Sequence, residues 1–145
     1  MSALHLLCKI DGGNYAIPAG DIFQLDSYAE PTKVPGTKPY VLGVTQVRQQ
    51  VVPVIDLRLR FGFPKLAPTP DSRVVVLNIR QRLVGLLVDS AREVENIPPE
   101  LFQLSAGLPS GDGAHGFVSA VAELKGKLIL LIDSLKVTGE DKNHG

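Results

Sequence analysis

Apolar and polar positions alternate along the chain in short segments. Runs of Val, Ile and Leu are interrupted by clusters of Gly, Asp, Asn, Arg and Gln, which predicts short β-strands joined by turns. Four hairpins are predicted, over residues 6–18, 41–57, 73–89 and 117–133, with turns at 11–14, 48–50, 80–82 and 125–127. Strands of this length and spacing are typical of a sandwich or of small barrels.

Helix is expected only in short pieces. A turn or two is predicted at Ala19–Gln24, at Ser90–Val94 and at Ser134–Val137. Other segments are expected to be irregular: a proline-rich connector at Pro64–Asp71, a mobile loop at Leu104–His115 and a frayed polar tail at Thr138–Gly145.

The second and fourth hairpins repeat one another. Residues 43–56 align without a gap on residues 120–133, so that Arg48 meets a lysine and Asp56 meets Asp133. Composition alone predicts scattered apolar matches and does not predict charged pairs in register. An internal repeat is therefore inferred.

The first and third hairpins also correspond, with Leu6 on Val75 and Leu25 on Val94. Each half of the chain then consists of a hairpin, a crossing segment and a second hairpin. We infer two similar β units of about 65–70 residues, packed on one another because each alone is near the lower size limit for a stable domain.

Composition narrows the class of protein. The chain has 145 residues, 44% of them hydrophobic and 21% charged, with zero formal net charge. This indicates one globular domain and gives no electrostatic signature of nucleic-acid binding. Cys8 is the only cysteine and lies in an apolar run, so a buried side chain is expected rather than a disulfide. No signal peptide or membrane-spanning run is evident, and a cytoplasmic protein without direct membrane insertion is expected.

Candidate catalytic chemistry is sparse. His5, His115 and His144 have no spacing that could close on a metal, and a single cysteine cannot form a zinc set. No nucleophile motif and no phosphate-binding loop are found. No catalytic residue, metal or cofactor is therefore predicted.

The repeated aspartates allow two interpretations. Paired aspartates perform acid catalysis in aspartic proteases, but Asp56 and Asp133 lack the small turn residues that expose such carboxylates. Each ends an apolar strand. The favoured interpretation is that each accepts hydrogen bonds from backbone amides as a cap.

Exposed apolar and basic positions are the remaining candidates. Arg48 is predicted at a hairpin tip, and arginine is well suited to anchoring an interface. Apolar residues cluster on the crossing segments 22–25 and 91–94. These clusters belong either to the core between the units or to the rim of a groove at the seam, and the pattern alone favours neither.

The central hairpin resembles the CheW family. The resemblance rests on Tyr40–Arg48 and on Val51–Arg58, where Pro53 stands inside an apolar strand that ends in Asp-Leu-Arg. It extends over nearly the whole chain, including Tyr15–Pro18 and Gly85–Asp89. It implies a mainly β fold of two pseudo-symmetric, five-stranded SH3-like barrels around a shared core, with short helical segments. Residues 1–137 are expected to form one domain whose subdomains, at about 20–65 and 70–137, exchange strands, followed by the tail at 138–145.

The resemblance also implies a non-enzymatic adaptor. Such proteins couple the cytoplasmic tips of chemoreceptors to the regulatory domain of a CheA-type histidine kinase. By motif match, receptor or kinase coupling is expected at Ile22, Gly43 and Arg48, and by extension at Leu25, Val47, Ala91 and Val94. Structural roles are expected at Pro53, Asp56, Arg58 and Asp133.

One departure from the family leaves an alternative open. The turn usually reads Asn-x-Arg-Gly but here reads Gln46-Val47-Arg48-Gln49. Loss of the glycine costs about 1 kcal/mol if the left-handed geometry persists, and a rebuilt turn would move Arg48. The chain could then be a divergent member that binds the kinase but not receptors. An enzyme or small-ligand protein built on paired barrels is the third possibility.

Overall fold

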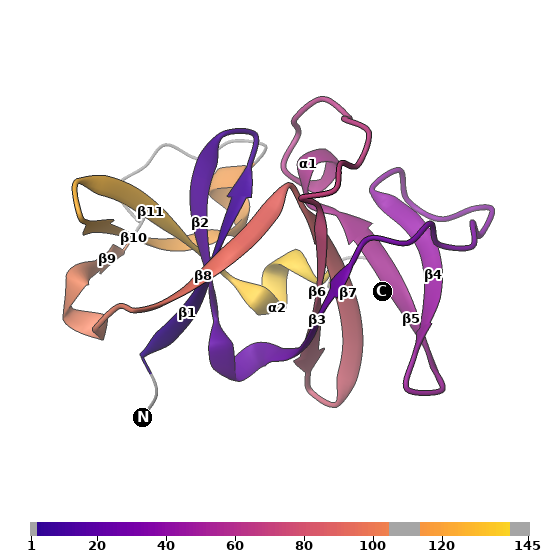
Figure 1. Cartoon of the computed structure of the whole chain (residues 1–145), viewed down its shortest axis with the longest axis horizontal. Helices are drawn as coiled ribbons and strands as arrows, with labels where there is room; N and C mark the ends of the chain where they lie inside the picture. Colours follow the sequence, from indigo (N-terminus) through magenta and orange to yellow (C-terminus); the bar gives the residue numbers. More distant parts are fainter. Residues whose placement is uncertain (1–2, 105–113, 140–145) are drawn as a thin grey trace.

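A computed structural model describes residues 3–104 and 114–139, which form two β-sheets side by side (Figure 1). The six-stranded sheet has the order β8-β1-β2-β11-β10-β9 and the five-stranded sheet the order β3-β6-β7-β5-β4. The strands of the first sheet are β1 (Leu4–Ile10), β2 (Gly13–Pro18), β8 (Ser90–Asn96), β9 (Phe102–Leu104), β10 (Val118–Leu124) and β11 (Lys127–Ile132). Those of the second are β3 (Ile22–Ser27), β4 (Val41–Val47), β5 (Gln50–Asp56), β6 (Arg73–Ile79) and β7 (Arg82–Val88).

Helical segments are short. The single-turn helices are η1 (Ala19–Asp21), α1 (Leu57–Arg60), η2 (Pro99–Leu101), η4 (Ala114–Phe117) and α2 (Ser134–Val137). Helix α2 lies between the two sheets (Figure 1), where Val137 is buried in the core. No helix in the described ranges has the length and apolar character needed to cross a membrane.

All four predicted hairpins are confirmed, as is the terminal helix at 134–137. The other two helix predictions are wrong beyond η1: residues 22–27 form β3 and residues 90–96 form β8. Both are edge strands that pair with a buried neighbour, β3 with β6 and β8 with β1. A segment of five or six residues is too short for its apolar pattern to distinguish a helical turn from such a strand, and pairing with the sheet decides the outcome.

The segments expected to be irregular are partly confirmed. Residues 64–71 contain no helix or strand. In the predicted loop, Leu104 ends β9 and Ala114 begins η4, while 105–113 lie outside the described residues. Thr138 is not part of a frayed tail, since it is buried and its hydroxyl donates to the carbonyl of Ser134 at 2.9 Å; residues 140–145 lie outside the described part.

The two halves of the chain exchange their first hairpins. Hairpin β1–β2 joins β8, β10 and β11 of the second half, and hairpin β6–β7 joins β3, β4 and β5 of the first. The five-stranded sheet is therefore built from residues 22–88, and the six-stranded sheet from residues 4–18 with 90–132. Parallel pairings make both junctions: Val54 pairs with Gly85, and Leu131 pairs with Ala16.

The repeat extends to irregular features. A bulge in β4 between Val41 and Gly43 matches a bulge in β10 between Val118 and Ala120. The backbone amide of Asp56 donates to the carbonyl of Tyr40 at 2.8 Å, and that of Asp133 donates to Phe117 at the same distance. The inferred duplication is thus visible in backbone geometry.

Three apolar clusters fill the molecule. The largest takes residues from both sheets and forms the shared core, including Ile10, Ile17, Val75 and Leu86. Each sheet also has its own interior cluster. The five-stranded sheet encloses Val47, Val52, Val54, Val74, Val76, Leu83 and Leu87, whereas the six-stranded sheet encloses the smaller set Ala16, Ile97, Ala122 and Ile129.

Candidate functional site

The crossing strands β3 and β8 carry four of the predicted coupling residues. In antiparallel sheets, paired residues have their side chains on the same face. On β3, Ile22 pairs with Leu77. On β8, Ala91 pairs with Cys8. Since Leu77 and Cys8 both belong to the shared core, both crossing strands turn these positions toward it.

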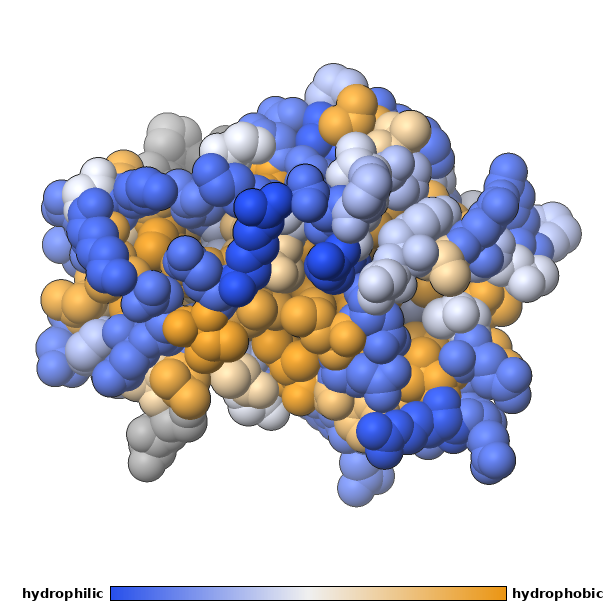
Figure 2. All heavy atoms as spheres, viewed as in Figure 1, coloured by the Kyte–Doolittle hydropathy of each residue, from blue (hydrophilic) through white to orange (hydrophobic). Residues whose placement is uncertain are grey.

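Leu25 and Val94 occupy the open edge of that core. Their pairing partners, Val75 and Leu6, are buried in the shared core, but Leu25 is 43% exposed and Val94 is 59% exposed. Ala91 is therefore buried in the shared core, whereas Leu25 and Val94 lie exposed at its edge. Figure 2 shows apolar atoms gathered in the middle of the visible face, where β1, η1 and β8 run in Figure 1.

Gly43 holds the edge strand β4 against the preceding segment. Its φ is +146°, and a Cβ atom there would collide with the carbonyl oxygen of Thr32 and lie 2.7 Å from the carbonyl carbon. The close approach allows Thr32 and Val44 to form a backbone bridge, with N–O distances of 2.8 and 2.9 Å. The role of Gly43 that the structure describes is therefore conformational.

Arg48 and Gln49 form the turn between β4 and β5. Their φ values are 50° and 70°, the pattern of a type I′ turn. The geometry is kept without the family's glycine, and Arg48 stays at the tip. Its Cζ lies 5.3 Å from the ring centroid of Phe23 on β3, whereas its neighbour Val47 is buried in the barrel interior.

Phe23 was not singled out as a site residue by the sequence. It is the extra residue of the bulge between Ile22 and Gln24, and it joins the Arg48 tip to the crossing strand β3. Strands β3 and β4 are the opposite edges of the five-stranded sheet, so this contact helps to close the sheet into a barrel. The Phe/Arg pattern at a distance of 25 positions gives no recognisable sequence signal.

Both aspartates act as caps, as predicted. Asp56 accepts from the amide of Arg58 at 2.9 Å, and Asp133 accepts from the amide of Lys136 at 3.1 Å. Burial raises the pKa of Asp56 above its usual range, against the opposing effect of the Arg58 and Leu59 amides. Each carboxylate is bound to its own helical turn rather than shared with the other.

Arg58 joins three separate segments. Its guanidinium donates to Asp11 in the first hairpin turn and to Asp89 after β7, both at 2.6 Å, and to the carbonyl of Pro64 at 2.9 Å. Burial opposes the charged form, but the carboxylates of Asp89 and Asp11 outweigh it and raise the pKa of Arg58. Pro53 lies half-buried within β5, opposite Val44.

The other candidate groups do not converge. Cys8 is buried as expected, and burial raises its thiol pKa to about 12. His5 Nδ1 lies 2.8 Å from the Ala3 carbonyl, with its ring against Phe102. The side chain of His115 and all of His144 lie outside the described residues. Within the described ranges, no three His, Cys, Asp or Glu side chains group as a metal site would require.

Comparison with known proteins gives a consistent result. The model of the CheW-like domain matches residues 4–142. The chain is 28% identical to the chemotaxis protein CheW of Bacillus subtilis (strain 168), over 96% of this chain and 88% of that protein. It is 27% identical to the protein PilI of Pseudomonas aeruginosa, over 65% of this chain and 53% of that one.

A solved structure shares the fold. The crystal structure of the scaffolding protein TtCheW from Thermoanaerobacter tengcongensis superposes with a TM-score of 0.81 at 27% identity, covering 91% of this chain and 84% of that one. The duplicated double-sheet architecture and the match across 4–142 together place the chain in the CheW-like domain family of chemotaxis adaptor and scaffold proteins.

Proposed function

We propose that this protein is a non-enzymatic adaptor that couples chemoreceptors to a CheA-type histidine kinase in a cytoplasmic array. The observation that carries the proposal is the exposed apolar rim of the shared core, formed by Leu25 and Val94 with half-buried Ile22 beside them. The rim is supported from below by rigid paired strands, which suits the binding of a preformed partner.

The receptor tip is the partner proposed for this rim. An amphipathic helical hairpin presents apolar side chains at the spacing of helical turns, and such helices dock into apolar grooves. Leu25 and Val94 occupy equivalent places in the two halves, so the rim offers two apolar contacts of similar kind. Arg48, held over Phe23, supplies a cation next to β3.

The kinase regulatory domain is proposed to bind elsewhere, at the outer faces of the equivalent hairpins β4–β5 and β10–β11. Val51 on β5 and Leu128 on β11 are equivalent residues, 72% and 66% exposed. Each stands next to an interior residue, Val52 or Ile129, and therefore points outward from its barrel. Exposed apolar residues at both ends of the molecule suit an adaptor with more than one partner.

Binding measured separately for each partner tests the proposal. Leu25→Asp and Val94→Asp are expected to weaken binding of a receptor hairpin at least tenfold and to leave binding of the kinase regulatory domain unchanged. Val51→Asp and Leu128→Asp are expected to do the reverse. Leu101→Asp, at a position 42% exposed in η2, is the matched control and should affect neither.

Two outcomes would overturn parts of the proposal. Normal receptor binding by both rim variants would exclude the rim as the receptor site. A wild-type chain that binds the kinase domain but no receptor hairpin would support the alternative of a divergent member that tunes array assembly. The type I′ geometry at Arg48 and Gln49 keeps Arg48 at the hairpin tip, which favours the coupling role over that alternative.

A further inference from the structure

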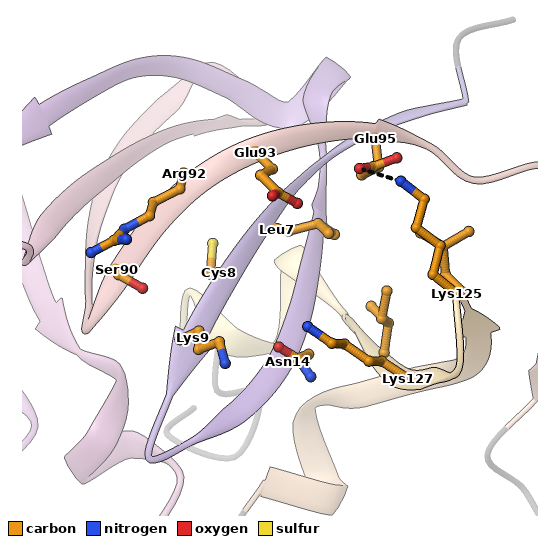
Figure 3. Close-up of a pocket in the computed structure, with 12 residues that line it drawn as sticks. Leu7, Cys8, Lys9, Asn14, Ser90, Arg92, Glu93, Glu95, Lys125 and Lys127 are labelled. Carbon is orange, nitrogen blue, oxygen red and sulfur yellow. Dashed lines mark hydrogen bonds and ion pairs between the residues drawn. The ribbon is translucent and has the colours of Figure 1, made fainter.

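The six-stranded sheet, called the second barrel below, encloses an interior that is incompletely filled, and the five-stranded sheet is called the first barrel. A pocket of about 450 Å³ opens between β8 and the β10–β11 hairpin, within the size range of small-molecule sites. Its apolar wall is formed by Leu7, Leu124 and Ile129. Figure 3 shows polar side chains from β1, β2, β8 and β11 around the hollow.

The internal repeat explains why the hollow exists. Asn14 occupies the position of Leu83 in the other half, and Arg92 occupies that of Phe23. Leu83 is buried in the interior cluster of the first barrel, and Phe23 covers its edge under Arg48. Asn14 therefore replaces an apolar side chain that fills the equivalent space, and Arg92 replaces one at the edge of that space.

Two lysines face this space from β1 and β11, the strands on either side of β2. Lys9 is two residues from Leu7 on β1, and Lys127 is two residues from Ile129 on β11. Residues two apart on a strand share a face, so each exposed lysine lies on the side of its strand that faces the barrel interior. Lys9 pairs directly with Asn14, and Figure 3 shows the ends of all three side chains in the lower part of the pocket. Their counterparts in the other half, Asn78, Leu83 and Gln50, are uncharged.

The charges of Lys9 and Lys127 are available for a ligand. Lys125 is paired with Glu95 at 3.4 Å, and Arg92 with Asp71 at 3.1 Å. Among the residues that the structure describes, no carboxylate lies within ion-pair distance of Lys9 or Lys127. Glu93 stands on the β8 wall, across the pocket from both lysines in Figure 3.

We infer that this pocket binds a small organic anion, whose carboxylate lies between Lys9 and Lys127 beside the Asn14 amide and whose short apolar body lies against Leu7, Leu124 and Ile129. Two ammonium groups and an amide donor supply charge-assisted hydrogen bonds for the carboxylate. Removal of the apolar body from water adds to the affinity. The pocket is lined by other side chains than those proposed to contact array partners, although Val94 and Leu128 are sequence neighbours of pocket residues.

Titration of the full chain with hexanoate, followed by backbone amide NMR, tests the inference. Hexanamide has the same body without charge, and inorganic phosphate has charge without the body. Hexanoate is expected to shift amides of residues 7–9, 14 and 124–129 with a millimolar Kd, and both comparison compounds to bind at least fivefold more weakly. Equal binding of hexanamide, or hexanoate shifts elsewhere on the molecule, would overturn the inference.

Variants sharpen the test. The double variant Lys9→Gln/Lys127→Gln should weaken hexanoate binding at least fivefold, whereas Lys136→Gln, an exposed lysine on α2, should leave it unchanged. Asn14→Leu, which copies the residue of the other barrel, should fill the hollow and abolish binding. Unchanged hexanoate binding in the double variant would overturn the inference, because the lysines would then not bind the carboxylate. If a variant does not fold, the comparison of the three compounds on the wild-type chain still tests the inference.

Discussion

Tyr40 and Phe117, equivalent residues of the two halves, hold the guanidinium of Arg60 between their rings. The Cζ atom lies 4.2 Å from the Tyr40 centroid and 4.6 Å from that of Phe117. The same guanidinium donates to the carbonyls of Lys136 and Val137 at 3.3 Å, at the end of α2. One side chain thereby connects both halves and the C-terminal helix at the seam.

Arg60→Lys is expected to lower the free energy of unfolding by about 1–2 kcal/mol, because an ammonium cannot stack on two rings and reach two carbonyls in one geometry. Urea denaturation measures the change. Arg80→Lys, in the exposed β6–β7 turn, is the control and should change stability by less than about 0.5 kcal/mol. Equal effects of the two variants would argue against a stabilising role for the contacts of Arg60 with the two rings.

Arg58→Ala is expected to destabilise the fold by about 2 kcal/mol. The substitution leaves Asp11 and Asp89 without their cation, and the figure lies below the range for a fully buried pair because both aspartates are partly exposed. Arg92→Ala removes an ion pair between two exposed side chains and should cost less than about 0.5 kcal/mol. A loss of similar size in both would mean that Arg58 acts only as a surface charge.

Gly43→Ala is expected to cost about 3 kcal/mol, because the added Cβ collides with the Thr32 backbone and the residue has a positive φ. Gly20→Ala is the matched control, since nothing lies within 4 Å of a Cβ at that position. Thermal unfolding of the two variants separates the effects. A tolerated alanine at Gly43 would show that the 32–44 bridge is dispensable.

Gln49→Gly is expected to stabilise the protein by up to about 1 kcal/mol. Gln49 has a φ of 70°, which glycine adopts without steric cost. Gln50→Gly, one residue later in extended β5, should instead destabilise by about 0.5–1 kcal/mol. Chemical denaturation of both variants gives the comparison, and the same sign for both would contradict the type I′ assignment.

Asp56→Asn is expected to change how stability depends on pH. Burial raises the pKa of Asp56 in the folded state, so between the ordinary value and the raised one the folded chain binds more protons than the unfolded chain. The contribution of Asp56 to stability therefore falls as pH rises through that window. Asparagine can still accept the Arg58 amide but does not ionise. The stability of the Asn variant relative to the wild type should rise as pH increases above the ordinary pKa of aspartate, as measured by denaturation at a series of pH values. A difference that stays constant with pH would contradict the burial effect.

Local features of the fold could be predicted from the sequence, and long-range pairings could not. The hairpins follow from short apolar runs next to turn residues, and the aspartate caps follow from their position after a strand. The exchange of β1–β2 and β6–β7 between the halves leaves no local pattern, because it is decided by which strand edge each hairpin meets. The strands β3 and β8 were mistaken for helical turns for the same reason.

The predicted coupling residues divide according to their depth in the molecule. Leu25, Val94 and Arg48 are accessible, whereas Val47 and Ala91 are buried. The motif match gave these positions but not their depth, because buried Val47 and Ala91 and exposed Leu25 and Val94 are all apolar. The contact between Arg48 and Phe23 arises only when the sheet curls.

The exchange of hairpins also determines when each strand meets its partners during synthesis. The five-stranded sheet comes from one continuous stretch, residues 22–88, so all of its strands are present once β7 has been made. Hairpin β1–β2 is made first yet must wait for β8, β10 and β11, more than seventy residues later. During that interval its apolar edge is open to a neighbouring nascent chain. A chain that stops before β8 would therefore have a first hairpin without any of its partner strands.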